Sequence, residues 1–414
     1  MGTTKWGSPV KLLVAFTLTV PLLTGCWDRQ EIEQRAVVLG IGVDESGENV
    51  EEREGEISHL KGSIPAPARG SVRVTLQIAV PGRIPLGPGG GGGGGQMGGG
   101  GGQNTVWVVD GIGKTIDDAL NNLQQRIAPP LFYGHLRVIV ISEAVSKKGI
   151  QSLNDTFRRN PEIRRMAWMV VCRGQAADIM KVSPQLERVP TFYLMDAMDM
   201  SVKMGRFPDD FLGIFWSSSS AKGREGFLPY VLLKEKGMVQ VSGMAFFKND
   251  KMVGTTKPLE VAMYMGIIGE NPAGGEGFVE VPGTKENMLF GARNRKSTIK
   301  ATIKEGKPHI EVNIIIEGNI LEKTSEQVTL SNDVIMEIEK ELEARTKTAY
   351  QNLIKKTQEK GSDIFGFGEQ IRAKQPRFWN REIKTKENWQ NMYKELSVDL
   401  SVQMNIRRIG MKAT

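Results

Sequence analysis

Residues 36–44, with the sequence AVVLGIGVD, are the stretch that decides the fold. A short apolar run that is rich in β-branched residues is typical of a buried central strand. Residues 71–80 (SVRVTLQIAV) alternate instead: Val72, Val74, Leu76 and Ile78 fall on one side, with polar residues between them. Because side chains alternate along a strand, this second stretch predicts a strand with one buried face.

Strand and helix signals continue on either side as far as residue 190. The sequence predicts further strands over 105–109, 137–141 and 166–172, and helices over 115–126, 143–149, 152–159 and 176–182. This mixture predicts one N-terminal α/β domain over residues 26–190.

A glycine-rich tract at residues 87–102, with 13 glycines in 16 positions, interrupts that domain. Such a segment cannot form a core and is expected to behave as flexible coil. Strand signals resume directly after it, and loop-closure entropy grows slowly with loop length. We therefore expect a surface-loop insertion.

The remainder of the chain is predicted to form three segments. Residues 191–226 are expected to be a connecting helix followed by a linker, with 211–222 as a loop. Residues 227–283 predict a small β-rich middle domain, and 284–414 a C-terminal α+β domain.

The C-terminal prediction depends on one long amphipathic helix. Ile335, Ile338 and Leu342 begin a stripe, at helical spacing, that continues over residues 333–360, and Gly361 is a typical stop signal. Strands at 297–303 and 309–316 precede the helix, and another at 396–406 follows it. This order predicts a mostly antiparallel sheet with a helix layer on one face. The overall expectation is a mixed α/β, α+β chain of three domains.

The N-terminus has the pattern of a lipoprotein signal over residues 1–25. Lys5 and Lys11 precede a 12-residue apolar stretch, too short to span a bilayer, which ends in Leu23-Thr24-Gly25-Cys26. Small residues before a cysteine behind such a core resemble a lipobox, in which cleavage after Gly25 leaves a diacylglycerol-modified Cys26 as the first mature residue. Two acyl chains hold a protein stably on a membrane, whereas one does so only marginally. We therefore expect a lipid-anchored, extracytoplasmic protein.

The composition argues against several other classes of protein. The 414 residues include only two cysteines and three histidines, which excludes a disulfide scaffold and disfavours a Cys/His zinc site. The formal net charge of +7 falls to +5 without Lys5 and Lys11 of the signal (52 Lys and Arg against 47 Asp and Glu), which is weak evidence for a polyanionic partner, and an extracytoplasmic location argues against nucleic acid. Cys172 lies in an apolar strand and is expected to be an inert buried thiol. We expect no metal, no cofactor and no enzymatic activity.

Two motifs resemble catalytic or binding sequences. Gly111-Ile112-Gly113-Lys114-Thr115 follows a strand and opens a helix, but Val108 stands where a phosphate-binding loop requires glycine. An ordinary helix start is the better interpretation. His135 could act as a base, but no serine or cysteine in a nucleophile-like context lies near it in the sequence, so a structural histidine is expected.

Two other clusters leave alternatives open. Arg158, Arg159, Arg164 and Arg165 could be a solvated loop with ion pairs to Glu162, or could contact anionic lipid or a partner. Residues 363–368 (DIFGFG) could be a tight turn held in the core, or could expose two aromatic rings to a partner.

Several of these blocks together resemble the Ger(x)C family, the C subunit of spore germinant receptors. The opening block is Gly25-Cys26-Trp27-Asp28-Arg29 with Gly40, Gly42 and Asp44 downstream. Later blocks contain Gly134 and His135, Arg164, and Asp363, Gly366 and Gly368. The glycine-rich tract departs from the family pattern in a loop of variable length.

The resemblance implies a three-domain lipoprotein on the outer face of the inner spore membrane. It implies a non-enzymatic component that works with two integral-membrane subunits of the A and B types and is needed for receptor assembly or signalling. An alternative from another class is a membrane-anchored solute-binding lipoprotein that captures a nutrient directly. Calorimetry against amino acids and sugars would distinguish the two.

Overall fold

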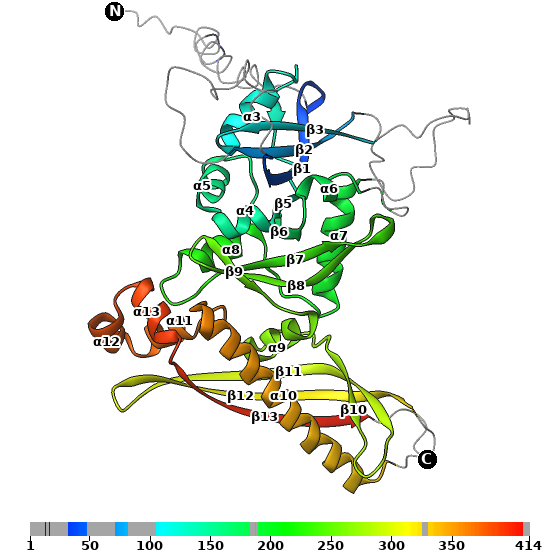
Figure 1. Cartoon of the computed structure of the whole chain (residues 1–414), viewed down its shortest axis with the longest axis vertical. Helices are drawn as coiled ribbons and strands as arrows, with labels where there is room; N and C mark the ends of the chain where they lie inside the picture. Colours follow the sequence, from blue (N-terminus) through cyan, green and yellow to red (C-terminus); the bar gives the residue numbers. More distant parts are fainter. Residues whose placement is uncertain are drawn as a thin grey trace, which may run out of the picture.

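The computed structural model describes residues 13, 16, 32–47, 71–81, 105–182, 187, 189–324 and 330–408. Two sheets, each with its own helices, are stacked along the long axis of the molecule (Figure 1). Mixed strands and helices in both units confirm the predicted fold class. No helix among the described residues has the length and apolar character that crossing a bilayer requires.

The first sheet has nine strands within the described part of the chain, in the order β3-β2-β1-β5-β6-β7-β8-β9, with β4 beside β1. Strands β1, β5, β6 and β7 are mutually parallel, and the outer strands pair antiparallel. The bounds are β1 Ala36–Glu45, β2 Val72–Ala79, β3 Val106–Gly113, β4 Leu131–Phe132, β5 Val138–Ser142, β6 Trp168–Arg173, β7 Phe227–Leu233, β8 Val239–Lys248 and β9 Lys251–Thr255. The predicted central strand, β1, is almost entirely buried.

Helices cover both faces of this sheet. One face packs against α3 (Ile116–Gln124), α4 (Glu143–Lys148), α5 (Gln151–Arg159) and α8 (Leu212–Ser220). The other face packs against α6 (Ala176–Ile179) and α7 (Pro190–Lys203). Alternate residues of β5 divide between the two cores, Ile139 facing the first and Val140 the second.

The prediction of a separate middle domain over 227–283 is wrong, because the strands in this segment belong to the two sheets. β7, β8 and β9 extend the first sheet, and β10 (Glu276–Glu280) pairs with β11 in the second sheet. Strand pairing between β6 and β7 joins residues about sixty positions apart, which local sequence patterns do not reveal.

The predicted loop over 211–222 is also wrong, because α8 occupies most of it. Its four serines have modest helix propensity, but Phe215 and Trp216 are buried, and the Phe215 ring packs edge-on against Phe247. Tertiary burial therefore overrides the local preference.

The second sheet has the order β10-β11-β12-β13, with β12 and β13 parallel and the other pairs antiparallel. Its long strands are β11 (Asn287–Lys304), β12 (Lys307–Lys323) and β13 (Ser397–Arg408). Helix α10 (Asn332–Lys360) crosses one face of this sheet, as predicted, and α9 (Pro258–Ile268) lies between the two units (Figure 1). Gly361 ends α10 in the left-handed conformation.

A small helical group lies at one end of the second sheet, beside the turn between β8 and β9 (Figure 1). It contains α11 (Phe367–Lys374), α12 (Pro376–Phe378), a π-helical turn at Trp379–Ile383 and α13 (Lys386–Tyr393). Two short 3-10 helices, Ile32–Gln34 and Glu235–Gly237, complete the described elements.

Candidate functional site

The predicted lipid-attachment residues, Gly25 and Cys26, lie outside the described residues, as do Trp27 and Asp28 and the glycine-rich tract. The lipid anchor at Cys26 therefore remains a prediction from the sequence. The remaining motif residues are described, and they fall at three places in the fold.

The first place is β1, where two glycines permit close packing of the helices on one face. A Cβ at Gly40 would lie 2.4 Å from Thr191 Oγ1 at the start of α7, and one at Gly42 would lie 3.0 Å from Met180 Cγ. Side chains at these positions would push both helices away from the sheet.

Asp44, near the end of β1, is fully buried and holds the start of α6. Its Oδ1 accepts a hydrogen bond from Ala176 N at 2.6 Å, and its Oδ2 accepts one from Ala177 N at 2.9 Å. Burial raises the pKa of this carboxyl group, although the two N–H groups and Arg73 oppose the shift. The arrangement is a helix cap reached across 132 residues.

The second place is the turn before β5, which contains Gly134 and His135. A Cβ at Gly134 would lie 2.3 Å from the Phe132 ring, and the His135 ring meets Phe132 edge-on with centroids 6.0 Å apart. Burial lowers the pKa of His135, and the charges of Arg164 and Arg137 lower it further. These neighbours favour the structural role that the sequence predicted.

The third place is the turn at residues 363–368, where one carboxylate fixes the backbone. Asp363 is buried, and its two oxygens accept hydrogen bonds from Gly366 N at 2.9 Å, Gly368 N at 2.8 Å and Trp389 Nε1 at 3.0 Å. Gly366 has a φ of 76°, which L side chains rarely adopt, and a Cβ at Gly368 would lie 2.4 Å from Trp389 Nε1. Burial raises the pKa of Asp363 to about 6, against the opposing effect of these donors.

Both phenylalanines of this turn are buried, which decides between the two alternatives left by the sequence. Phe365 stacks on Tyr264 of α9 and on Phe367, with ring centroids 5.8 and 5.2 Å apart. The tight turn held in the core is confirmed, and the exposed aromatic contact is wrong.

A polar cluster beside this turn joins the two units of the chain. Glu225, ahead of β7, accepts hydrogen bonds from Gln390 Nε2 at 2.6 Å and Asn249 N at 3.0 Å, and pairs with Lys386 Nζ at 3.0 Å. Its backbone N–H donates to Asp363 O at 2.8 Å. Burial raises the pKa of Glu225, and Lys386 is the main opposing charge.

Two further charged residues, Arg224 and Asp210, lie close to this turn. Arg224 Nη2 donates to Tyr264 Oη at 3.0 Å, while Asp210 is buried with no hydrogen-bond partner for its Oδ2 in the described structure. Burial raises the pKa of Asp210 well above its ordinary value, and Arg224 only partly opposes this. Sequence reasoning missed Asp210, Arg224 and Glu225, because no periodicity or spacing sets them apart.

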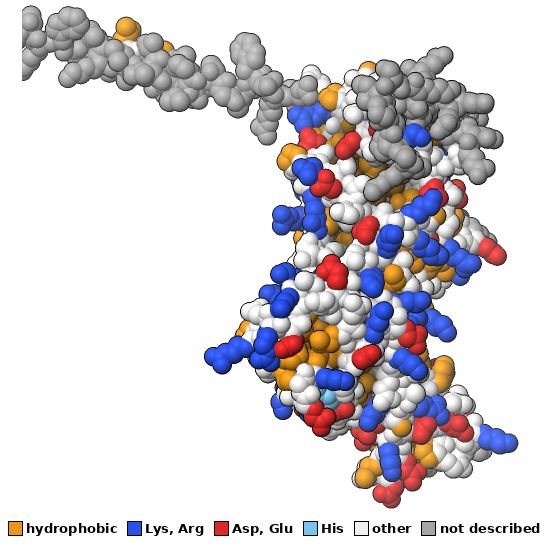
Figure 2. Space-filling model, turned by 60° about the vertical axis from the view of Figure 1, so that its left-hand side comes forward, with side chains coloured by type: hydrophobic (Ala, Val, Ile, Leu, Met, Phe, Trp, Pro, Cys, Tyr) orange, Lys and Arg blue, Asp and Glu red, His pale blue; other side chains and the backbone are white. Residues whose placement is uncertain are grey.

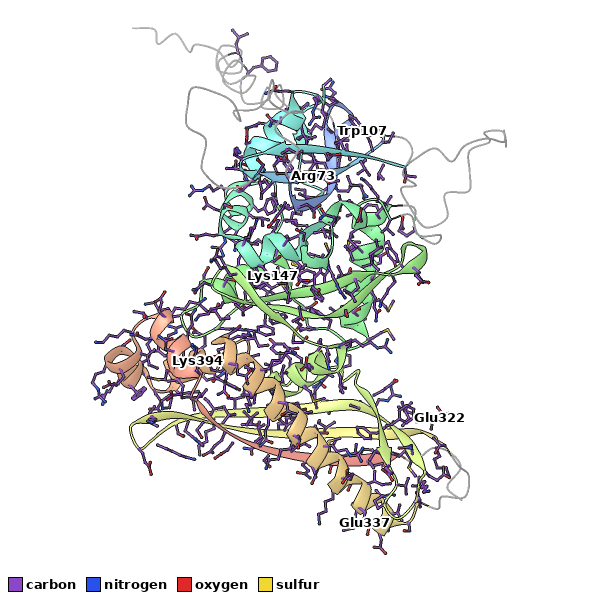
Figure 3. All side chains as sticks on the ribbon, in the orientation of Figure 1. Arg73, Trp107, Lys147, Glu322, Glu337 and Lys394 are labelled. Carbon is purple, nitrogen blue, oxygen red and sulfur yellow. The ribbon has the colours of Figure 1, made fainter. Side chains whose placement is uncertain are left out.

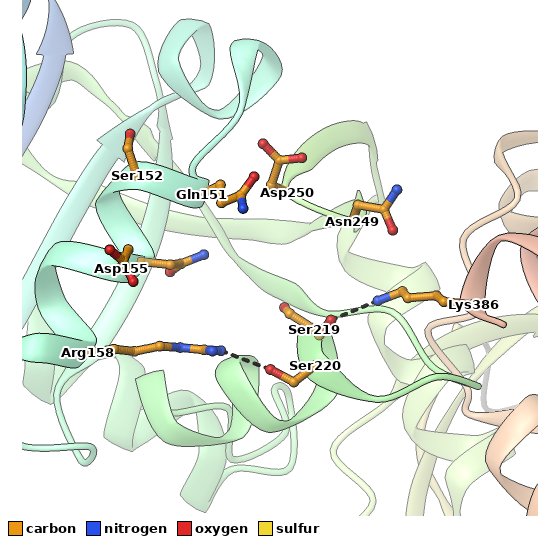
Figure 4. Close-up of a pocket in the computed structure, with 10 residues that line it drawn as sticks. Gln151, Ser152, Asp155, Arg158, Ser219, Ser220, Asn249, Asp250 and Lys386 are labelled. Atoms are coloured by element: carbon orange, nitrogen blue, oxygen red, sulfur yellow. Dashed lines mark hydrogen bonds between the residues drawn. The ribbon is translucent and has the colours of Figure 1, made fainter.

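A polar cleft of about 700 Å³ opens beside this junction (Figure 4). Its sides come from α5, the end of α8, the turn between β8 and β9, and Lys386 at the start of α13. Lys386 Nζ donates to Ser219 O at 2.8 Å, and Arg158 Nη2 donates to Ser220 Oγ at 3.1 Å. Among the described residues that line the cleft, no serine hydroxyl group is hydrogen-bonded to a carboxylate or a histidine.

The described residues contain no group of three or more His, Cys, Asp and Glu side chains placed to hold a metal ion. Cys172 is buried, and burial raises the pKa of its thiol, so the thiolate needed for reactivity is disfavoured. Basic and acidic side chains are interspersed over the face seen in Figure 2. That mixed surface differs from the basic stripe of a nucleic-acid-binding protein.

Comparison with known proteins gives consistent matches over almost the whole chain. One family model, described as the spore germination protein N-terminal domain, matches residues 28–233, and another, described as spore germination B3/GerAC like, C-terminal, matches residues 242–410. Spore germination protein YndF of Bacillus subtilis (strain 168) is 26% identical, covering 97% of each chain. Spore germination protein KC of the same organism is 24% identical, covering 97% of this chain and 96% of the relative. The crystal structure of the GerBC protein, at 19% identity, shares the fold with a TM-score of 0.53 and covers 83% of this chain and 96% of that one.

Proposed function

Because the chain belongs to the Ger(x)C family of spore germination proteins, we propose that it is a lipid-anchored, non-enzymatic subunit of a nutrient-germinant receptor. The proposal places it on the outer face of the inner spore membrane, where it works with two integral-membrane subunits of the A and B types. Its role there is in receptor assembly or signalling. The observation that carries this proposal is the position of the two matched domains, the first of which begins at residue 28, two positions after Cys26 of the predicted lipobox.

The anchor part of the proposal rests on the sequence around Cys26. A short apolar core and small residues precede the cysteine. Modification of its thiol with diacylglycerol supplies two acyl chains, which suffice for stable membrane attachment.

The non-enzymatic part rests on how the motif residues are used. Asp44 caps a helix, and Asp363 is occupied by three N–H donors. Gly40, Gly42 and Gly368 allow close packing. A carboxylate whose lone pairs are filled by backbone and indole donors is poorly placed to act as a general base. These residues therefore support a role in building and joining the two units.

Substitution of the anchor residue tests the proposal. A Cys26→Ala chain should be synthesised but should leave the membrane fraction of sporulating cells, and germination with the matching nutrient should weaken. The matched control is Cys172→Ala, which removes the other cysteine and leaves the lipobox intact. Normal membrane retention of Cys26→Ala would contradict the anchor.

The partner part needs a separate measurement. An affinity-tagged chain, extracted from spore inner membranes in mild detergent, should carry with it two multispanning proteins of the A and B types. Recovery of the chain alone, at detergent concentrations that preserve other membrane complexes, would contradict the proposed assembly.

A further inference from the structure

A second groove, of about 910 Å³, lies next to the cleft of Figure 4 and shares Arg158 and Ser220 with it. Its walls come from α5 and the turn that follows it, from α8, and from α11 of the C-terminal unit. The groove is therefore built by both units of the chain. Its size is in the range of small-molecule sites.

Positive charge dominates this groove. Four guanidinium groups line it, from Arg158, Arg165, Arg224 and Arg372, against a single carboxylate, Glu369. That carboxylate is already used: its Oε1 accepts from Gly223 N at 2.7 Å, and its Oε2 accepts from Arg372 Nε and Nη2 at 2.8 and 2.6 Å. The negative charge of Glu369 is thus paired with Arg372, and it does not neutralise the other three arginines.

The remaining three arginines form no ion pair in the described part of the chain. Arg165 has no side-chain hydrogen bond there, and Arg224 donates through Nη2 to Tyr264 while its buried Nε has no partner. Burial lowers the pKa of Arg224, but Tyr264, Asp210 and Asp363 lie near its guanidinium group and together raise that pKa above its ordinary value. The Asp363 oxygens are engaged with the turn, so they give Arg224 no direct pair.

Arg158 is held in position by its surroundings. Its guanidinium lies 5.2 Å from the Trp216 ring centroid, and its Nη2 donates to Trp216 O at 3.0 Å and to Ser220 Oγ. An arginine that is already ordered loses less conformational entropy when it binds a ligand.

Serine and apolar residues also line the groove. Hydroxyl groups of Ser217, Ser218 and Ser220 line it together with Phe157 and Ile163. Guanidinium forks match the paired oxygens of carboxylate and phosphate groups, and hydroxyl groups complete such sites. We propose that this groove binds an oxyanion, a carboxylate or phosphate group, carried by a small molecule or a lipid headgroup.

The same segment provides matched controls, because only half of its arginine cluster lines the groove. Arg159, next to Arg158, is paired with Asp155 at 2.8 Å and is exposed. Arg164, next to Arg165, lies near His135. Neither is among the residues that line the groove.

The test compares an Arg158→Gln/Arg165→Gln chain with an Arg159→Gln/Arg164→Gln chain of equal charge, both as full-length protein. Binding is measured by isothermal titration with inorganic phosphate and with citrate, and by co-sedimentation with phosphatidylcholine vesicles with and without phosphatidylglycerol. We expect the groove variant to lose at least about tenfold in affinity, since one charge-assisted contact is worth about a factor of ten. The control variant should bind like the wild type.

The two arms identify the source of the anion. Saturable binding of phosphate or citrate supports a small-molecule ligand, whereas binding to anionic vesicles alone, lost in the groove variant, supports a headgroup. Equal losses in both variants would show general charge attraction and overturn the proposal. Absence of binding in both arms would also overturn it, and would leave an acidic protein partner to be sought instead.

Discussion

Trp389 Nε1 donates a hydrogen bond to Asp363 Oδ2 at 3.0 Å, and this buried contact ties the turn at residues 363–368 to helix α13. The same helix carries Lys386 and Gln390, which hold Glu225 of the first unit. One carboxylate therefore fixes the turn and the helix that together contact the neighbouring unit. We conclude that this turn sets the geometry of the junction.

Replacing the carboxylate should destabilise the protein strongly. In Asp363→Asn, the amide nitrogen cannot accept from an N–H group, so at least one of the three buried donors loses its partner. We expect the free energy of unfolding to fall by about 2–4 kcal/mol. Urea denaturation measures it, with the exposed Asp209→Asn as the control. A loss equal to that of the control would show that Asp363 does not organise the turn.

A second buried carboxyl group predicts a pH dependence. Burial raises the pKa of Asp210 in the folded state, so its contribution to stability is complete below the unfolded pKa. That contribution is lost as pH rises through the folded pKa. The asparagine side chain of the Asp210→Asn variant stays neutral at every pH and does not lose this contribution. The free energy of unfolding of the variant should therefore rise relative to that of the wild type as pH increases from 4 to 8.

Urea midpoints of the two proteins at several pH values test this prediction. The difference between them isolates Asp210, because other buried carboxyl groups with raised pKa values, such as Asp363 and Glu225, are common to both. Two parallel curves would mean that Asp210 does not titrate differently in the folded chain.

The parts of the fold that sequence predicted are those fixed by local patterns. The stripe of apolar residues in α10 and its stop at Gly361 depend on neighbours within one or two turns. Joining β7 to β6 depends on partners about sixty residues away, so the predicted middle domain was wrong. Helix α8 was missed because burial of Phe215 and Trp216 outweighs its serine-rich sequence.

The same distinction applies to the site. Asp363 and its glycines stand within six residues of one another, so the motif was visible in the sequence. Glu225 and Gln390, by contrast, are 165 positions apart and meet only in the folded chain. No pattern in either segment indicates that contact.

The close approach of the two units predicts a steric effect. A Cβ at Gly223 would lie 2.3 Å from the backbone carbon of Gly368, which cannot rotate away as a side chain could. Gly223→Ala should therefore cost about 1–3 kcal/mol of unfolding free energy by overpacking. Gly277→Ala, where nothing lies within 4 Å, is the matched control and should be close to neutral. Equal thermal stabilities of the two variants would show that the junction can relax.

The last prediction concerns the edge of the second sheet, which is formed by β13. Helix α10 covers part of this edge: Glu343 Oε1 accepts from Met404 N at 3.0 Å, and Glu339 Oε1 accepts from Ile406 N at 2.6 Å. An edge strand with free N–H groups can pair with another chain, and charged side chains oppose such pairing. The Glu339→Ala/Glu343→Ala variant should therefore self-associate, with a mean mass in light scattering that rises with concentration. The control Glu337→Ala/Glu359→Ala removes two exposed carboxylates from the same helix, of which Glu337 points away from the chain (Figure 3), and should stay like the wild type. Both variants lose negative charge on the same helix. Association of the first variant alone would therefore show that the exposed backbone of β13 causes it. An equal response of the two variants would instead show that the change in net charge causes it.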